Sequence, residues 1–136
     1  NFSLPIARKA RRVTGIEGLD DLVDSARANA RHNGIENCEF DVADLSGQVG
    51  DRAWSRAGFD AVLLDPPRSG ALEILPIVAD SGARRVVYVS CNPATLARDA
   101  GELVRRHGFE LKVAGIADMF PHTAHVESIA LFERAV

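Results

Sequence analysis

Segments with the pattern of β-strands alternate along the chain with segments that have helical spacing. The apolar, β-rich segments are residues 12–17, 38–42, 59–65, 85–90, 109–116 and 128–133. The helical segments are residues 2–10, 19–32, 72–80 and 94–106, and Asn33-Gly34 marks the end of the second. This alternation predicts an α/β fold, a mostly parallel sheet with helices on both faces. The last two strands follow each other directly, which predicts an antiparallel hairpin at the sheet edge.

The composition is that of one globular domain. The 136 residues are 46% hydrophobic and 26% charged, which favours a packed core over disorder. No apolar run approaches the roughly 18 residues of a membrane span, and no secretory signal opens the sequence. Cys38 and Cys91 are the only cysteines, so neither a disulfide framework nor a metal site is predicted. We expect a cytoplasmic protein with no membrane contact.

The net charge and the basic residues neither indicate nor exclude RNA as a binding partner. The net charge is −3, whereas domains that bind polyanions in general are usually basic. Of the 16 basic residues, however, all but Lys9 and Lys112 are arginines, which suit bidentate phosphate contacts. The densest basic groups, residues 8–12 and 105–107, fit a solvated surface as well as a nucleic-acid footprint.

Three acids and a thiol lie at or shortly after the carboxyl ends of predicted parallel strands, the edge where such sheets bind ligands. They are Glu17, Asp44, Asp65 and Cys91. Glu17 stands where an acid accepts hydrogen bonds from ribose hydroxyls, or where a carboxylate favours the start of the next helix. Asp44 is either part of the same site or a turn residue that bonds its own backbone.

The sequence contains no GxGxxG motif. In a nucleotide-binding sheet this loop joins the first strand to the helix that here begins near Phe2. The first strand and its loop would then precede Asn1. We therefore expect a fragment that begins just after its cofactor loop.

Cys91 stands where a predicted strand meets a helix, because Asn92-Pro93 ends the strand and helical spacing follows. Free backbone N–H groups and the positive helix end favour a thiolate at such a junction, so Cys91 is a candidate nucleophile. The alternative is a packed structural cysteine at the strand end.

Four stretches carry a resemblance to a known family: residues 15–17, 64–71, 89–99 and 118–128. With them the whole chain resembles the RNA uracil-5-methyltransferases that use S-adenosylmethionine. Within that family it is most similar to the iron–sulfur branch that acts on 23S rRNA. The motif around Cys91 and the closing Phe-Pro-His-Thr segment are specific together, and they favour the nucleophile reading of Cys91.

The resemblance implies a Rossmann-like methyltransferase fold and C5-methylation of a uridine in 23S rRNA. It implies that Cys91 is the nucleophile and Glu127 the general base, and that the cofactor contacts are Asn1, Glu17, Asp44 and Asp65. Residues 1–136 would form the C-terminal part of the catalytic domain. The family's RNA-binding region and the region that binds the 4Fe-4S cluster would lie upstream of them. The family's glycine-rich loop would end at Asn1. The isolated chain is therefore expected to fold, to bind the cofactor weakly and to be inactive.

The chemistry implied by the resemblance explains these residue types. A thiolate at Cys91 adds to uracil C6 and makes C5 nucleophilic, and a base must later remove the C5 proton. Glu127, partly desolvated beside Phe120 and Val126, fits this role, with His122 and His125 as rivals. The target base must leave its stack to reach the thiol. Asp65 would orient the cofactor and the pyrimidine, and Arg68 would meet either an RNA phosphate or a nearby acid.

Other activities fit less well or remain open. An amino-methyltransferase needs no cysteine and typically places an aromatic residue where Arg68 stands. RNA cytosine-5-methyltransferases usually carry a second cysteine in the segment where Arg68 and Ser69 stand. A tRNA uracil-5-methyltransferase and a non-catalytic nucleotide-binding or assembly module, with a structural Cys91, remain as alternatives. The sequence of residues 120–125 favours rRNA over tRNA as the substrate, and it does so by resemblance to the family only.

Overall fold

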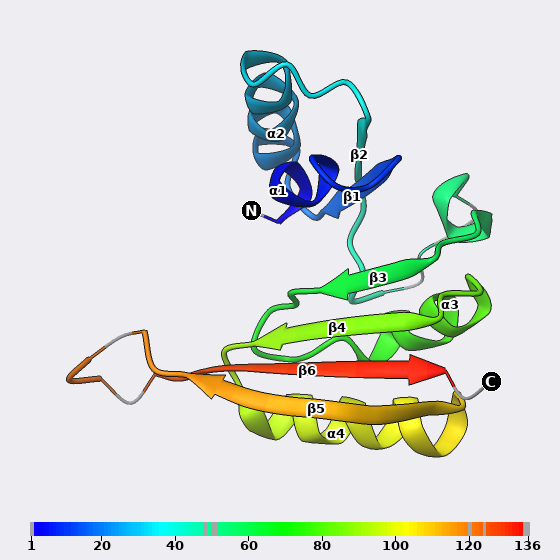
Figure 1. The fold of residues 1–136 in the computed structure, drawn as a ribbon, viewed down its shortest axis with the longest axis vertical. Coiled ribbons are helices and arrows are strands. Elements are labelled where there is room, and N and C mark those ends of the chain that lie inside the picture. Colours follow the sequence, from blue (N-terminus) through cyan, green and yellow to red (C-terminus); the bar gives the residue numbers. More distant parts are fainter. Residues whose placement is uncertain (1, 48, 50–51, 120, 124, 135–136) are drawn as a thin grey trace. The chain divides into compact units, whose positions relative to one another are not determined.

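The computed structural model describes residues 2–47, 49, 52–119, 121–123 and 125–134. The elements fall into two compact units, Asn1–Val49 and Gly50–Val136, and each unit has its own sheet (Figure 1). Strands and helices alternate as the sequence predicts, so the α/β class is confirmed. None of the described helices has the length and apolar character that a membrane crossing requires.

The first unit is a parallel strand pair with two helices. Its elements are α1 (Ser3–Ala7), β1 (Val13–Glu17), α2 (Asp20–His32) and β2 (Cys38–Val42). The strands pair in register from Val13↔Cys38 to Glu17↔Val42, so both carboxyl ends lie at one edge. Its buried core is built of small apolar side chains, among them Ala7, Val23, Ala30 and Ala43.

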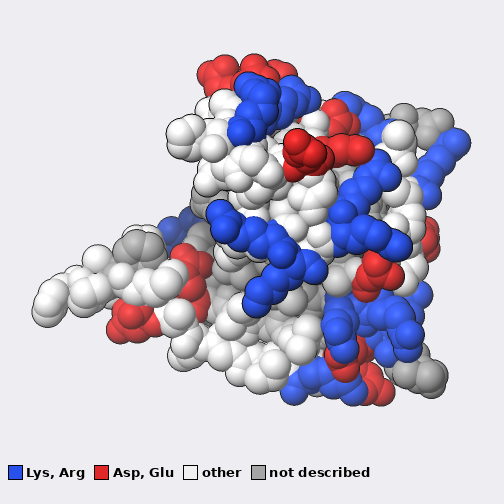
Figure 2. Space-filling model, turned by 45° about the horizontal axis from the view of Figure 1, so that its top comes forward, with Lys and Arg blue, Asp and Glu red and all other residues white. Residues whose placement is uncertain are grey.

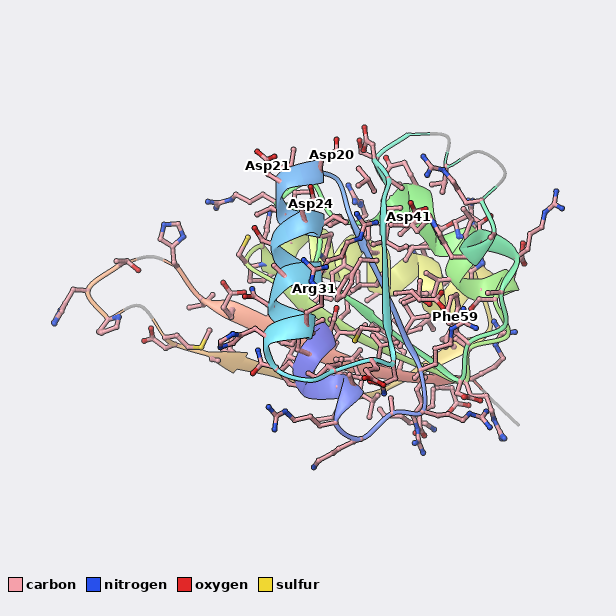
Figure 3. The ribbon with its side chains drawn as sticks, turned by 90° about the horizontal axis from the view of Figure 1, so that it is seen from above. Asp20, Asp21, Asp24, Arg31, Asp41 and Phe59 are labelled. Atoms are coloured by element: carbon pink, nitrogen blue, oxygen red, sulfur yellow. The ribbon has the colours of Figure 1, made fainter. Side chains whose placement is uncertain are left out.

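The charges and the ending of α2 explain why this segment is helical. Acidic Asp20 and Asp21 occupy the first turn and basic Arg31 the last, which complements the helix dipole (Figure 3). At the other end Gly34 has φ +62°, and its N–H donates to the carbonyl of Arg31. The N–H of Ile35 reaches back to Ala30. This pair of bonds is a Schellman motif, so the stop predicted at Asn33-Gly34 is confirmed.

The second unit carries a four-stranded sheet with the order β3-β4-β6-β5. The strands are β3 (Ala61–Leu64), β4 (Arg85–Ser90), β5 (Phe109–Ala117) and β6 (Glu127–Arg134). The helices are α3 (Leu75–Asp80) and α4 (Pro93–Arg106), and the 3-10 turns are η1 (Trp54–Arg56) and η2 (Leu72–Ile74). β3 and β4 are parallel, whereas β6 runs antiparallel to both β4 and β5.

The predicted antiparallel hairpin exists, but of its two strands only β5 lies at an edge of the sheet. β6 returns between β4 and β5 and pairs with β4 from Arg85↔Glu133 to Ser90↔Ser128. The helix predicted over residues 72–80 is divided into η2 and α3. Pro76 lies in the first turn of α3, where its missing N–H costs no helical hydrogen bond.

One face of the four-stranded sheet forms the core of the second unit. Every second residue of β4 is buried, which gives Val86, Tyr88 and Ser90 one common face. Ala130 and Phe132 of β6 lie on the same face by register. The helix α4, which runs along the strands in Figure 1, contributes its buried side chains to this core. The packing of this face holds the last residue of β4, Ser90, in the core, and Cys91 follows it directly.

Candidate active site

Cys91 lies between the end of β4 and the start of α4, the junction predicted from the sequence. It is a free cysteine and half-buried. The Ser90 hydroxyl accepts a hydrogen bond from the N–H of Asn92 and donates to its carbonyl, both at 3.0 Å, which turns the backbone around Cys91. The Asn92 side chain accepts from the N–H of Ala94 at 3.1 Å and caps α4. Cys91 is therefore presented at a helix start and is not enclosed in the core.

The other cysteine, Cys38, has a different environment. It begins β2 in the first unit, and its Sγ lies 3.8 Å from the carbonyl oxygen of Ser3. Burial raises the pKa of the Cys38 thiol, which disfavours the thiolate. Cys38 therefore fits a structural role.

Glu127 is the first residue of β6 and is half-buried. The ladder between β4 and β6 ends at the pair Ser90↔Ser128, so Cys91 and Glu127 are the next residues on each side. The buried Ser128 hydroxyl donates to the carbonyl of Ser90 at 2.9 Å and ties the two backbones together. The structure thus brings the predicted nucleophile and the predicted base to neighbouring positions.

Asp65 directly follows β3 and is exposed. Because Leu64 pairs with Tyr88 in a parallel register, the ends of β3 and β4 lie at the same edge of the sheet. Asp65, Cys91 and Glu127 therefore share one edge of the second unit. The Asp65 carboxylate has no hydrogen bond or ion pair to any residue that the structure describes, which leaves both of its oxygens available.

Glu17 and Asp44 belong to the first unit, at the carboxyl edge of its strand pair. Glu17 ends β1, is exposed, and accepts a hydrogen bond from the N–H of Gly18 at 2.7 Å through Oε1. Asp44 Oδ1 accepts from the Ser46 hydroxyl at 2.6 Å and from its N–H at 2.8 Å. Both bonds lower the pKa of Asp44, and the bond from the Ser46 hydroxyl has the larger effect. They are the bonds of a turn residue, and contact with a cofactor remains a prediction for both acids.

The four residues Glu17, Asp44, Asp65 and Cys91 do not share the edge of one sheet as expected. Glu17 and Asp44 belong to the two-stranded sheet of the first unit, whereas Asp65 and Cys91 follow strands of the four-stranded sheet. Asn1 and Phe120 lie outside the described residues. His122 and His125 are exposed in the connection between β5 and β6. Arg68 is also exposed and has no ion pair within the described part of the chain.

A buried acid of α4, not among the residues predicted from the sequence, lies close to the site. Asp99 of α4 is 0% exposed, and its Oδ2 accepts from the Tyr88 hydroxyl at 2.6 Å and from the N–H of Ala71 at 2.7 Å. The Arg98 Nε donates to Oδ1 at 2.7 Å, and this bond raises the pKa of Arg98. Burial, followed by the hydrogen bond to Asp99, raises the pKa of Tyr88. A signal was present, because Asp99 lies between Leu96 and Leu103 on the apolar stripe of its helix.

Basic and acidic side chains are mixed on the surface, and several arginines are paired with acids. In Figure 2 acidic side chains are interspersed among the basic ones on the face that is drawn. Arg12, for example, is paired with Glu39, and Arg85 with Glu133. Within the described residues no group of three or more histidine, cysteine or acidic side chains could hold a metal ion.

The comparisons with known proteins agree with the sequence motifs. The family described as tRNA (Uracil-5-)-methyltransferase matches residues 1–135. The protein named 23S rRNA (uracil(1939)-C(5))-methyltransferase RlmD from Alkalilimnicola ehrlichii is 60% identical over 134 residues, 98% of this chain and 30% of the relative. The protein of the same name from Pseudomonas aeruginosa is 60% identical over 133 residues, 98% of this chain and 29% of the relative. The chain thus spans about 30% of the length of these relatives.

Solved structures show the same fold at low sequence identity. Magnesium protoporphyrin IX methyltransferase from Synechocystis PCC 6803 with bound SAH has a TM-score of 0.72 and 17% identity, over 98% of this chain and 68% of that one. TYW2 from M. jannaschii in complex with AdoMet has a TM-score of 0.69 and 17% identity, over 98% and 64%. The Rossmann-like methyltransferase fold predicted from the sequence is therefore confirmed.

Proposed function

Because the chain belongs to the tRNA (uracil-5-)-methyltransferase family, we propose that the full-length protein methylates C5 of a uridine in 23S rRNA. The identity of 60% to relatives named for 23S rRNA supports this substrate over tRNA. The observation that carries the proposal is the placement of Cys91 next to Glu127 where the β4–β6 ladder ends. We place the reaction in the cytoplasm, where ribosomal RNA is a substrate.

S-adenosylmethionine fits as the methyl donor, and when bound it supplies an electrophilic methyl group. The acids proposed to contact it keep acceptor atoms for it: within the described residues, Glu17 Oε2 and Asp44 Oδ2 have no protein donor. An exposed carboxylate at the end of a parallel strand suits a ribose hydroxyl. Asp65 and Asn1 complete the proposed contacts, and Asn1 does so by family resemblance alone.

Cys91 and Glu127 divide the chemistry on the uracil ring between them. The Cys91 sulfur forms a bond to C6, and the electrons of the C5–C6 double bond move toward C5 and the C4 oxygen. C5 thereby becomes nucleophilic enough to take the methyl group. Glu127 then removes the C5 proton, the double bond forms again, and the bond from C6 to sulfur breaks. Each residue is needed at a different stage, which makes their roles separable by mutation.

The proposal also assigns residues 1–136 to the C-terminal part of a larger catalytic domain. The share of the relatives that the chain covers supports this assignment. The glycine-rich cofactor loop, an RNA-binding region and the 4Fe-4S cluster would then belong to other parts of the full-length protein. A non-catalytic nucleotide-binding module is the remaining alternative.

The test uses the full-length protein with isotope-labelled S-adenosylmethionine and either 23S rRNA or tRNA transcripts. We expect labelled 5-methyluridine in 23S rRNA and none in tRNA. With Glu127→Gln, addition and methylation proceed but the C5 proton stays, so methylated RNA should accumulate on the protein as a slow band in a denaturing gel. Cys91→Ala should abolish both turnover and the band.

Three outcomes would contradict parts of this proposal. Turnover by Cys91→Ala would exclude the covalent uracil reaction. Normal turnover by Glu127→Gln without a trapped band would transfer the base role to His122 or His125. Label in tRNA but not in 23S rRNA would overturn the proposed substrate.

A further inference from the structure

The loop of residues 65–71 is fastened to the segment that follows Cys91. Three side chains of that segment bond three loop residues. The Asn92 amide donates to the carbonyl of Arg68 at 3.1 Å, and the Arg98 Nη2 donates to the carbonyl of Ser69 at 2.8 Å. Asp99 accepts from the N–H of Ala71 at 2.7 Å. We call Asn92, Arg98 and Asp99 the loop clamp.

Asp99 is the buried centre of the loop clamp. A carboxylate with no exposed surface is costly to bury unless its charge is balanced and its oxygens are bonded. Asp99 meets both conditions through the Arg98 guanidinium and the two donors on Oδ2. One of these donors is Tyr88, which lies on β4 three residues before Cys91. The same carboxylate therefore bonds the loop and the strand that leads to the thiol.

The fit between the loop and the clamp is close. Gly70 has φ +90°, and a Cβ at this position would lie 2.5 Å from Arg98 Nη2 and 2.6 Å from Asp99 Oδ2. The Gly70 N–H also closes a turn onto the carbonyl of Pro67 at 2.9 Å. These contacts hold residues 68–71 against α4, and Asp65 begins the same loop.

We propose that the loop clamp is a positioning device for the uracil reaction, with Asp99 and Arg98 as its positioning residues. The clamp fixes Asp65 relative to Cys91, so that the group that orients the substrate and the group that attacks it move as one body. This inference rests on the proposed function. It predicts that loosening the clamp slows the chemical step, because misplacement by about 1 Å can cost about a hundredfold in rate.

The test compares two arginine-to-lysine variants of the full-length protein. Arg98→Lys keeps the charge but loses the planar fork that bonds Asp99 and Ser69 together. Arg85→Lys is the matched control, because Arg85 bonds Glu133 at the opposite end of β4. We expect kcat to fall about tenfold in Arg98→Lys while the KM for RNA stays within about threefold. Arg85→Lys should match the wild type in both.

Hydrogen–deuterium exchange supplies a readout that does not depend on the reaction. Peptides covering residues 65–72 should exchange faster in Arg98→Lys, and in Tyr88→Phe as a second variant, but not in Arg85→Lys. Unchanged exchange in both variants overturns the clamp, whether or not the protein methylates RNA. Faster exchange with an unchanged kcat overturns the positioning role. A wild-type protein that forms no 5-methyluridine refutes the proposed function, and the exchange data still decide the clamp.

Discussion

Asp44 shows how a single neighbour, Ser46, lowers the pKa of a candidate site residue. Its carboxylate is bonded by the Ser46 hydroxyl and N–H, which favour the ionised form and lower its pKa from the ordinary 3.8. A lowered pKa in the folded state stabilises the fold above the unfolded-state pKa. This contribution is lost as the pH falls through the folded-state pKa. An aspartate with the ordinary pKa is already ionised at neutral pH, so these bonds extend the ionised form of Asp44 to lower pH.

Ser46→Ala removes the larger of the two bonds and keeps the N–H. We expect the pKa of Asp44 to rise toward its ordinary value, and the acid-side loss of stability due to this residue to shrink. A pH titration of the Asp44 carboxyl carbon by NMR measures the change. Ser55→Ala is the control, because the Ser55 hydroxyl bonds the backbone of Arg52. An unchanged Asp44 titration in Ser46→Ala would refute the assigned cause.

At the scale of single residues, the sequence predicted Cys91, Asp65 and Glu127 as site residues because each lies in a stretch that resembles a family motif. The strand before Cys91 and the helix after it could also be predicted, since the spacing of apolar residues differs between a strand and a helix. The helical spacing places Asp99 on the apolar stripe of α4, but its residue type normally indicates a surface position, so the sequence did not reveal which partners its carboxylate would find. Its partners are distant in sequence, with Ala71 28 positions away. Only the folded chain brings them together.

Among the structural elements, the turn before α3 depends on a glycine. Gly70→Ala should destabilise the protein for two reasons, the positive φ and the clash with Arg98 and Asp99. Gly82 offers a matched control, since its φ is +79° and a Cβ there meets nothing within 4 Å. We expect Gly82→Ala to lower the free energy of unfolding by about 1–2 kcal/mol, and Gly70→Ala to lower it further. Urea denaturation measures both, and equal losses would exclude the clash.

The positions of the strands were predictable, but their order was not. Each strand has a local period that the sequence shows, and the two final strands were rightly expected to pair with each other. The pairing of β6 with β4 depends on which apolar faces fit together across the whole unit. Because that pairing places Glu127 beside Cys91, the site geometry could be expected only by family resemblance.

At the scale of the whole chain, the two units differ in the size of their sheets. A two-stranded sheet is marginally stable by itself, and the core of the first unit consists mainly of small side chains. The second unit has a four-stranded sheet, and its core includes the large buried side chains Tyr88, Phe109 and Phe132. We expect backbone amides of β1 and β2 to exchange with deuterium faster than those of β4 and β6 in the isolated chain. Equal protection in both units would contradict this prediction.

The insertion of β6 between β4 and β5 has a consequence for biosynthesis. A ribosome completes β4 and β5 well before it adds residues 127–134, which supply the strand between them. Until then Cys91 lacks Glu127 beside it, and the sheet lacks the strand between β4 and β5. A nascent chain released before residue 127 would therefore expose the unpaired edges of β4 and β5, a surface prone to aggregation.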